Sequence, residues 1–125
     1  MDKKIRIGVM GCADIAQRLV IPAIQQLSEK FKLVGVASRT ADKARSFADI
    51  FACESIEGYN TLVLRVDIDA VYIPLPTGLH KEWIIKALEH GKHVYAEKSI
   101  AMNGIDAEDM VTCAKLNRVA LMEGY

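Results

Sequence analysis

Short apolar runs of the kind that form buried parallel strands alternate with helix-period patterns along the whole chain. The strand-like runs cover residues 5–10, 32–38, 69–73, 93–96 and 119–122, with a weaker one near Ile56. Runs without polar alternation are typical of strands covered on both faces. The helical patterns between them cover residues 15–27, 40–51, 61–65, 77–91 and 106–116. This alternation predicts an α/β fold: a doubly wound parallel Rossmann sheet of about six strands, with helices on both faces.

Particular residues set the expected limits of these elements. Pro22 has no N–H to donate within the first helix, so we expect a kink there or a break into two helices. Thr40 is expected to cap the second helix, whose apolar stripe consists of Ala44, Phe47, Ala48 and Phe51. Thr77 is expected to start the fourth helix and Gly91 to close it. Residues 123–125 look like the end of the last strand.

Length and charge limit the class of protein. The chain has 125 residues, a formal net charge of zero and 26% charged residues. This length fits one domain, which we take as residues 1–125, and a neutral chain without a basic block does not indicate a nucleic-acid partner. The apolar run near the N-terminus is too short for a signal sequence or a membrane span. We therefore expect a cytoplasmic protein without a membrane partner.

The cysteines do not form a metal-binding pattern. Cys12, Cys53 and Cys113 are odd in number and far apart, and the sequence has no Cys-x-x-Cys pair or Cys/His cluster. Zinc sites in proteins need such spacing. We expect no metal and interpret the three cysteines as small buried hydrophobic residues.

A turn of small residues joins the first strand to the first helix. Residues 8–16 read Gly-Val-Met-Gly-Cys-Ala-Asp-Ile-Ala, so Ala13 stands where the middle glycine of G-x-G-x-x-G/A would be. A pyrophosphate bound there needs backbone N–H groups at a helix N-terminus and an approach that a Cβ would obstruct. A βα turn without a ligand is the alternative interpretation. The predicted cofactor-binding residues are Gly8, Gly11, Cys12, Ala13, Asp14 and Ile15.

The end of the second strand predicts which dinucleotide binds. An Asp or Glu at this point bonds the adenosine ribose hydroxyls, whereas an Arg accommodates a 2′-phosphate. The strand ends without a carboxylate, and the polar residues that follow are Ser38, Arg39, Thr40 and Lys43. Hydroxyls can donate hydrogen bonds, and the two basic groups can pair with phosphate. We expect these residues to bind NADP, with NAD also open; a capped helix start with solvated basic residues is the alternative.

Further candidate site residues follow the fourth and fifth predicted strands. The fourth strand is followed by residues expected to form a rigid wall of the cofactor crevice, namely Pro74, Leu75, Pro76 and Thr77. His80 is either a donor to ribose or substrate, or an ordinary residue of a first helical turn. Glu97 and Lys98 follow the fifth strand. A lysine near a nicotinamide can bind a sugar hydroxyl and relay its proton, whereas a surface ion pair with Glu97 is the alternative.

In combination these segments resemble the Gfo/Idh/MocA family, named for glucose–fructose oxidoreductase, inositol dehydrogenase and a rhizopine-catabolism protein. The resembling segments follow the family order almost from end to end: residues 7–16, Pro22, and residues 37–39, 69–77, 79–80 and 91–98. The family's Glu-Lys-Pro motif matches Glu97-Lys98-Ser99. Ser99 stands where the family usually has a proline, often after a cis peptide bond.

The resemblance implies a Rossmann domain that binds NAD(P), followed in the whole protein by an α/β domain for substrate and subunit contacts. It implies an oxidoreductase acting on a hydroxyl or carbonyl of a sugar, cyclitol or related polyol, with Lys98 as the catalytic or substrate-binding lysine. Glu97 and Lys98 are also expected to contact the cofactor. We expect a homo-oligomer at full length and no dehydrogenase activity from the 125 residues alone. The alternatives are a non-catalytic dinucleotide-binding module, such as a sensor or regulator, and a Rossmann domain for another adenosine ligand.

Overall fold

The computed structural model describes residues 4–124, and within them six parallel strands form one sheet in the order β3-β2-β1-β4-β5-β6. The strands are β1 (Ile5–Met10), β2 (Phe31–Ser38), β3 (Glu54–Glu57), β4 (Ala70–Ile73), β5 (His93–Glu97) and β6 (Leu121–Gly124). The α-helices are α1 (Ile21–Gln26), α2 (Ala41–Phe51), α3 (Tyr59–Val63), α4 (His80–Glu89) and α5 (Gly104–Asn117). The predicted doubly wound sheet is therefore confirmed, in the strand order of a Rossmann fold.

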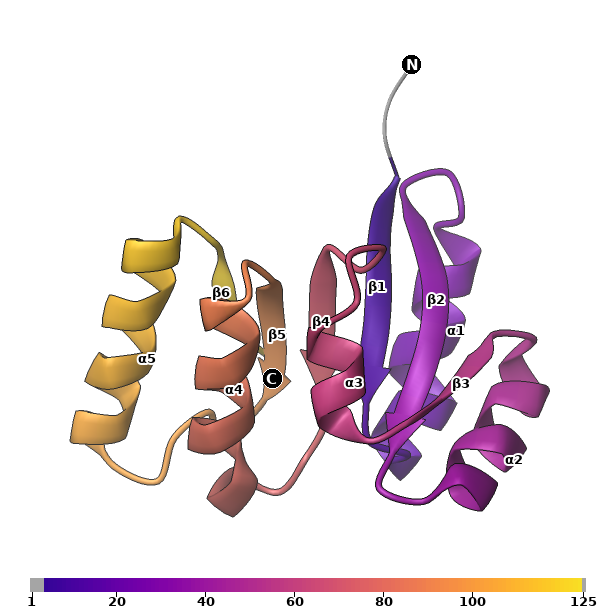
Figure 1. Ribbon diagram of the computed structural model, residues 1–125, viewed down its shortest axis with the longest axis horizontal. Helices are drawn as coiled ribbons and strands as arrows, with labels where there is room; N and C mark the ends of the chain where they lie inside the picture. Colours follow the sequence, from indigo (N-terminus) through magenta and orange to yellow (C-terminus); the bar gives the residue numbers. More distant parts are fainter. Residues whose placement is uncertain (1–3, 125) are drawn as a thin grey trace.

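The buried side chains form two clusters, one on each face of the sheet. Figure 1 shows α3, α4 and α5 in front of the sheet and α1 behind it. Successive residues of a strand point to opposite faces. In β4, Val71 and Ile73 accordingly pack with Ile84 of α4, whereas Tyr72 belongs to the cluster of Ile21 and Phe47 on the other face. The sheet is thus covered by helices on both sides, as its continuous apolar strands require.

The first helix contains a π-helical stretch, Ala16–Val20, directly before α1. Pro22 lies in the first turn of α1, a position where the N–H that proline lacks would have no partner within that helix. The N–H of Ile21 bonds the carbonyl oxygen of Ala16, five residues back. The expected interruption at Pro22 therefore takes the form of a π-turn, and the chain stays helical from residue 14 to residue 26.

Two helix starts differ from the sequence prediction. Thr40 occupies the N-cap position of α2, but its side chain makes no capping hydrogen bond with the described residues. Thr77 begins a 3₁₀ turn, Thr77–Leu79, and α4 begins after it at His80. The hydroxyl of Thr77 donates to the carbonyl oxygen of Ser99 at 2.9 Å, so it stabilises a contact between two loops rather than a helix start.

Other elements begin or end a few residues away from their predicted limits. Helix α3 begins before the predicted residue 61, and α5 begins at Gly104 because the side chain of Asn103 accepts a capping hydrogen bond from the N–H of Asp106 at 2.9 Å. Strand β6 ends at Gly124, and Tyr125 lies outside the described residues. The prediction of buried cysteines is wrong. All three are free and partly exposed, because none lies on a strand covered on both faces.

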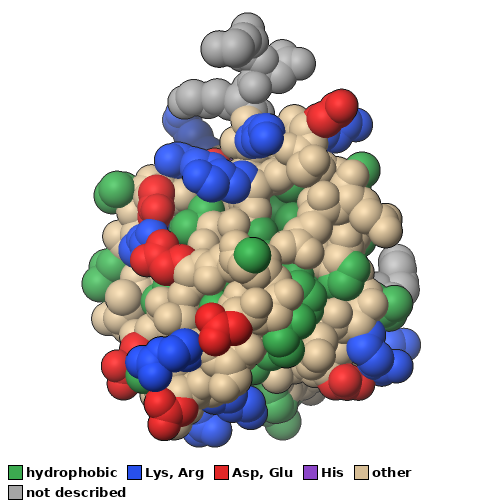
Figure 2. All heavy atoms as spheres, turned by 90° about the vertical axis from the view of Figure 1, so that its right-hand side faces the viewer, with side chains coloured by type: hydrophobic (Ala, Val, Ile, Leu, Met, Phe, Trp, Pro, Cys, Tyr) green, Lys and Arg blue, Asp and Glu red, His purple; other side chains and the backbone are tan. Residues whose placement is uncertain are grey.

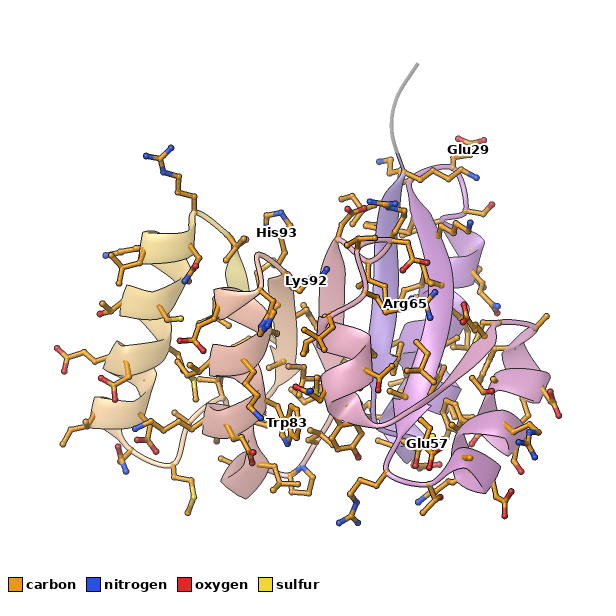
Figure 3. The ribbon with its side chains drawn as sticks, viewed as in Figure 1. Glu29, Glu57, Arg65, Trp83, Lys92 and His93 are labelled. Carbon is orange, nitrogen blue, oxygen red and sulfur yellow. The ribbon has the colours of Figure 1, made fainter. Side chains whose placement is uncertain are left out.

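Opposite charges pair at the edge of the sheet where the strands begin. The guanidinium of Arg65 donates to the carboxylates of Glu54 and Asp67 at 2.7–2.9 Å. The ammonium of Lys92, which is only 7% exposed, donates to the carbonyl oxygens of Arg65 and Ile68. Figure 3 shows Lys92 near the upper end of β5. These bonds connect β3 and the segment before β4 to the start of β5.

The surface carries charges of both signs. On the face shown in Figure 2, positive and negative side chains are interspersed around hydrophobic ones rather than gathered into one large field of a single sign. Within residues 4–124, no helix is both long enough and apolar enough to cross a bilayer.

Replacing Arg65 should make stability less dependent on pH. The pKa values of Glu54 and Asp67 are lowered because Arg65 hydrogen-bonds both carboxylates. A lowered folded-state pKa contributes stability above the ordinary pKa, and this contribution is lost as pH falls through the folded-state value. Arg65→Gln should therefore lower the free energy of unfolding by about 0.5–1 kcal/mol at neutral pH, since the pairs are partly exposed, and by almost nothing near pH 2.

Urea unfolding at the two pH values measures this difference. Lys115→Gln, which removes an exposed charge in the last turn of α5, serves as the control and should change stability little at either pH. An equal loss for Arg65→Gln at both pH values would contradict the role of the ion pairs.

Candidate functional site

The carboxyl ends of the strands meet at one edge of the sheet, the lower edge in Figure 1. Because β2, β1, β4 and β5 are neighbours in that order, the loops that follow them lie one after another along this edge. Neighbouring strands are about 4.8 Å apart, so the ends of β2 and β5 are separated by about 14 Å. Figure 3 shows Glu57 and Trp83 toward this edge and His93 toward the opposite one.

The turn after β1 has no room for a side chain. Gly11 has a φ of +109°, a conformation that favours glycine, and a Cβ there would lie 2.9 Å from Cδ2 of Leu75. Its N–H donates to the carbonyl oxygen of Ala37 at 2.9 Å, which ties the turn to β2. Cys12 and Ala13 follow, partly exposed, just before the first helix. These two residues are the part of the turn whose backbone a pyrophosphate would approach.

Other residues of this segment have partners within the protein. Gly8 lies inside β1, and a Cβ there would lie 2.9 Å from Cδ1 of Ile68, so this glycine packs against the core and does not face the turn. The exposed carboxylate of Asp14 pairs with Arg18 at 2.8 Å. Ile15 is partly exposed beside it. The predicted contacts of Asp14 and Ile15 with a cofactor stay predictions.

Exposed basic side chains lie just beyond the end of β2. Arg39, Thr40 and Lys43 are exposed, whereas Ser38 is only 5% exposed. The side-chain oxygen of Ser38 accepts a long hydrogen bond of 3.4 Å from the N–H of Thr40. Glu57, at the end of β3, is in register with Ser38. The end of β2 has no carboxylate of its own, but the neighbouring strand β3 places the carboxylate residue Glu57 beside it.

Three contacts hold the loop after β5. Besides the bond from Thr77 to Ser99, Nδ1 of His80 lies 3.0 Å from the carbonyl oxygen of Ile100. The N–H of Ile100 donates to Oε2 of Glu123 at 2.8 Å. The partners come from the 3₁₀ turn after β4, from α4 and from β6, so the loop is fixed from both sides.

His80 faces the interior rather than the edge. Its side chain is fully buried, and Nε2 lies 2.6 Å from the carbonyl oxygen of Leu75. Both ring nitrogens therefore face backbone oxygens, to which a neutral ring donates one hydrogen bond and an imidazolium two. This geometry does not provide the predicted contact with ribose or substrate, because no ring nitrogen is left for a ligand. Leu75 and Pro74 are buried, and Pro76 is the exposed part of the predicted wall.

The side chain of Glu97 is held by Tyr72. The Tyr72 hydroxyl donates to Oε1 of Glu97 at 2.7 Å. Tyr72 is 2% exposed, and burial raises its pKa, so the hydroxyl is a neutral donor. Lys98 is exposed and makes no hydrogen bond or ion pair with the described residues. The alternative of a surface ion pair with Glu97 is thus wrong. The Lys98–Ser99 peptide is cis.

Sequence reasoning missed Glu57, Tyr72 and Glu123, because register decides where their side chains lie. Tyr72 pairs with Tyr95 in the parallel register of β4 and β5, so Tyr72 and Glu97 share one face of the sheet. Side chains alternate between the two faces of β4, so knowledge of the register would have identified Tyr72 as a neighbour of Glu97.

The structure does not support a nucleophilic cysteine or a metal site among the described residues. Burial raises the pKa of the Cys12 thiol, which makes it a poor nucleophile. Residues 4–124 contain no group of three or more His, Cys, Asp or Glu side chains placed to hold a metal ion.

A parallel sheet of this strand order, with a glycine turn leading into the first helix and basic residues just beyond β2, defines a dinucleotide-binding Rossmann domain. The residues present fit such a ligand. The tight turn at Gly11 leads into the first helix through the small, partly exposed Cys12 and Ala13, and exposed Arg39 and Lys43 follow the neighbouring strand.

The chain belongs to the Gfo/Idh/MocA family, an oxidoreductase family with an NAD-binding Rossmann fold, which matches residues 5–125. It is 48% identical over 125 residues to the dTDP-3,4-didehydro-2,6-dideoxy-alpha-D-glucose 3-reductase of Saccharopolyspora spinosa, covering 100% of this chain and 37% of that protein. It is 38% identical over 120 residues to the scyllo-inositol 2-dehydrogenase (NADP(+)) of Bacillus subtilis, covering 95% of this chain and 36% of that protein. The chain thus spans little more than a third of the length of these relatives.

The fold agrees with that of a solved relative. The crystal structure of a 3-ketoreductase from Actinomadura kijaniata, in complex with NADP and TDP-benzene, matches with a TM-score of 0.93 and 44% identity. The match covers 98% of this chain and 37% of that chain. The predicted family and fold are both confirmed.

A side chain at Gly11 should destabilise the protein. Gly11→Ala places a Cβ on a backbone of positive φ and 2.9 Å from Leu75, so the free energy of unfolding should fall by about 1–3 kcal/mol. Gly104→Ala is the matched control, because a Cβ there, in the first turn of α5, would meet nothing within 4 Å. Alanine at Gly104 should leave stability unchanged or raise it by up to about 1 kcal/mol. Thermal unfolding of both variants tests this, and equal stability of the two would contradict it.

Proposed function

We propose that this domain binds the cofactor of an NADP(H)-dependent oxidoreductase that interconverts a hydroxyl and a carbonyl group of a sugar, cyclitol or related polyol. The observation that carries the proposal is the order of groups along one edge of the sheet. Arg39 follows β2, the glycine turn follows β1, and Lys98 follows β5. This order suits a ligand that has phosphates at one end and a reacting group at the other.

The residues after β2 support NADP(H) as the cofactor. A guanidinium pairs with phosphate oxygens through two parallel hydrogen bonds, and Arg39 is exposed at this point. The 3-ketoreductase of Actinomadura kijaniata was crystallised with NADP, and the Bacillus subtilis relative is named as an NADP(+) enzyme. Glu57 favours NAD(H) as a second cofactor, because a carboxylate beside Ser38 can accept hydrogen bonds from ribose hydroxyls.

Lys98 is the residue proposed to act on the substrate. The bound cofactor would supply or accept the hydride. The ammonium of Lys98 has three donors and no partner among the described residues, so it would hydrogen-bond the substrate oxygen and transfer its proton. The bonds to Ser99 and Ile100 hold the adjacent backbone. Glu97, fixed by Tyr72, would keep a hydrogen-bond acceptor at the same end of the cofactor.

The proposal extends to the whole protein. Its substrate would be a small sugar-like molecule and its assembly a homo-oligomer, both supported by the family resemblance. Its location would be the cytoplasm, supported by the three free cysteines, because a reducing compartment keeps thiols unpaired.

Reversing the charge of Arg39 tests the cofactor. Arg39→Asp should weaken NADP⁺ binding by at least about tenfold, since a hydrogen bond to a charged group contributes about 1.5–3 kcal/mol, and should leave NAD⁺ binding equal or stronger. Trp83 lies against Tyr59 toward this edge, so its fluorescence can report both titrations. Lys30→Asp reverses a charge at the opposite edge, where Lys30 precedes β2, and should change neither affinity. Equal affinity of the parent for NADP⁺ and NAD⁺ would refute the proposed preference.

Replacing Lys98 tests the proposed reaction in the whole protein. Lys98→Met should lower kcat by about 10²–10⁴-fold, the usual contribution of a positioned proton donor, while the Kd for NADPH changes little. Lys115→Met, at an exposed position of α5, is the matched control and should retain the parent kcat. An unchanged kcat in Lys98→Met would remove Lys98 from the reaction.

A further inference from the structure

We infer that Tyr59 is a positioning residue that holds the guanidinium of Arg39 ready for a 2′-phosphate, and thereby contributes to the preference for phosphorylated adenosine ligands. The inference rests on the proposed function, because it concerns the adenosine end of the same site. Tyr59 is the first residue of α3 and lies outside every motif found in the sequence.

The backbone fixes Tyr59 beside the end of β2. The N–H of Gly58 donates to the carbonyl oxygen of Ser38 at 2.7 Å, which ties the turn between β3 and α3 to the last residue of β2. Gly58 has a φ of +91°, so a glycine is needed for the chain to turn here into α3. Arg39 and Tyr59 each directly follow one partner of this hydrogen bond. Their side chains therefore start from neighbouring points of the same edge.

The ring of Tyr59 is held from its other side by Trp83. The two ring centroids are 5.3 Å apart and the ring planes meet at 84°, the favourable edge-to-face arrangement. Both rings are partly buried against the core beneath α3 and α4. The Tyr59 hydroxyl lies 4.0 Å from the place that a Cβ of Gly11 would take. It therefore points toward the phosphate-binding turn.

The hydroxyl of Tyr59 orients Arg39 without neutralising it. Arg39 acts electrostatically on this hydroxyl: its charge lowers the pKa of Tyr59, although burial has the larger effect and raises it. The hydroxyl is neutral, so its oxygen can accept a hydrogen bond from Arg39 while its hydrogen is donated elsewhere. A carboxylate in the same place would cancel the positive charge that a phosphate needs.

Holding Arg39 before the ligand arrives should improve affinity. A free arginine side chain has many rotamers and loses this freedom when it pairs with phosphate. A side chain that is already oriented loses less, so part of the cost of binding is removed. From the usual contribution of one hydrogen bond, the effect on affinity should be about three- to tenfold, smaller than the effect of removing the charge of Arg39.

Two ligands that differ only in the 2′-phosphate test the inference, adenosine 2′,5′-bisphosphate and adenosine 5′-monophosphate. Calorimetric titrations are made on the parent, Tyr59→Phe, Arg39→Gln and the double variant. Tyr59→Phe should weaken binding of the bisphosphate about three- to tenfold and leave binding of the monophosphate unchanged. In the Arg39→Gln background, Tyr59→Phe should have no further effect. Phenylalanine keeps the ring contact, so the emission maximum of Trp83 without ligand should stay the same.

The controls separate this role from a merely structural one. Tyr95→Phe removes a hydroxyl from a partly exposed strand position and should change neither affinity. Equal weakening of both ligands by Tyr59→Phe, or additive losses in the double variant, would overturn the inference. If the parent binds the two ligands equally, the proposed cofactor preference fails and the inference with it. If the parent prefers the bisphosphate and Tyr59→Phe prefers it equally, the role of Tyr59 is refuted while the proposed cofactor preference stands.

Discussion

The pairing of β4 with β1 is the constraint on which the site depends. Strand β3 is the outermost strand next to β2. After it the chain crosses over β2 and β1 to form β4, which pairs with the free side of β1, Gly8 opposite Val71. The helix after β1 and helix α4 then cover opposite faces, so the loops after β1 and β4 separate at the edge between them. Gly11 and Leu75 meet at this point, and the missing Cβ of Gly11 lets the two loops approach. The glycine turn after β1 is thereby placed between the loops that carry Arg39 and Lys98.

The two edges of the sheet use charge in different ways. Where the strands begin, Arg65 bonds two carboxylates and Lys92 bonds two backbone oxygens, so these cations have their donors occupied by the protein. Where the strands end, Lys98 has no partner among the described residues and Arg39 is exposed. Charges that are paired within the protein connect neighbouring elements. Charges without a partner in the protein add little to the free energy of unfolding before a ligand binds. The cations paired within the protein and the cations proposed to bind a ligand thus lie at opposite ends of the same strands.

The sequence predicts the strands better than the contacts at their ends. Strand β1 has the predicted limits because a continuous apolar run is typical of a strand with two covered faces. Thr77 and His80 could not be placed in this way, because their partners, Ser99 and Ile100, come from a loop distant in sequence. Local propensity favours Thr77 as a helix cap, and a hydrogen bond to another loop overrides it. Tyr72 was missed for the same reason, since only the register places it near Glu97.

Neutral groups hold the charged side chains proposed to act at the carboxyl edge. Tyr72 donates to Glu97, and in the proposal for the adenosine end the Tyr59 hydroxyl accepts from Arg39. A neutral hydroxyl fixes the direction of a charged group but leaves its charge available, because one hydrogen bond does not neutralise a carboxylate or a guanidinium. A tyrosine hydroxyl is already neutral at physiological pH, and burial raises the pKa of both tyrosines further. Both tyrosines therefore act as neutral hydrogen-bonding groups that are fixed in place by their packing in the core.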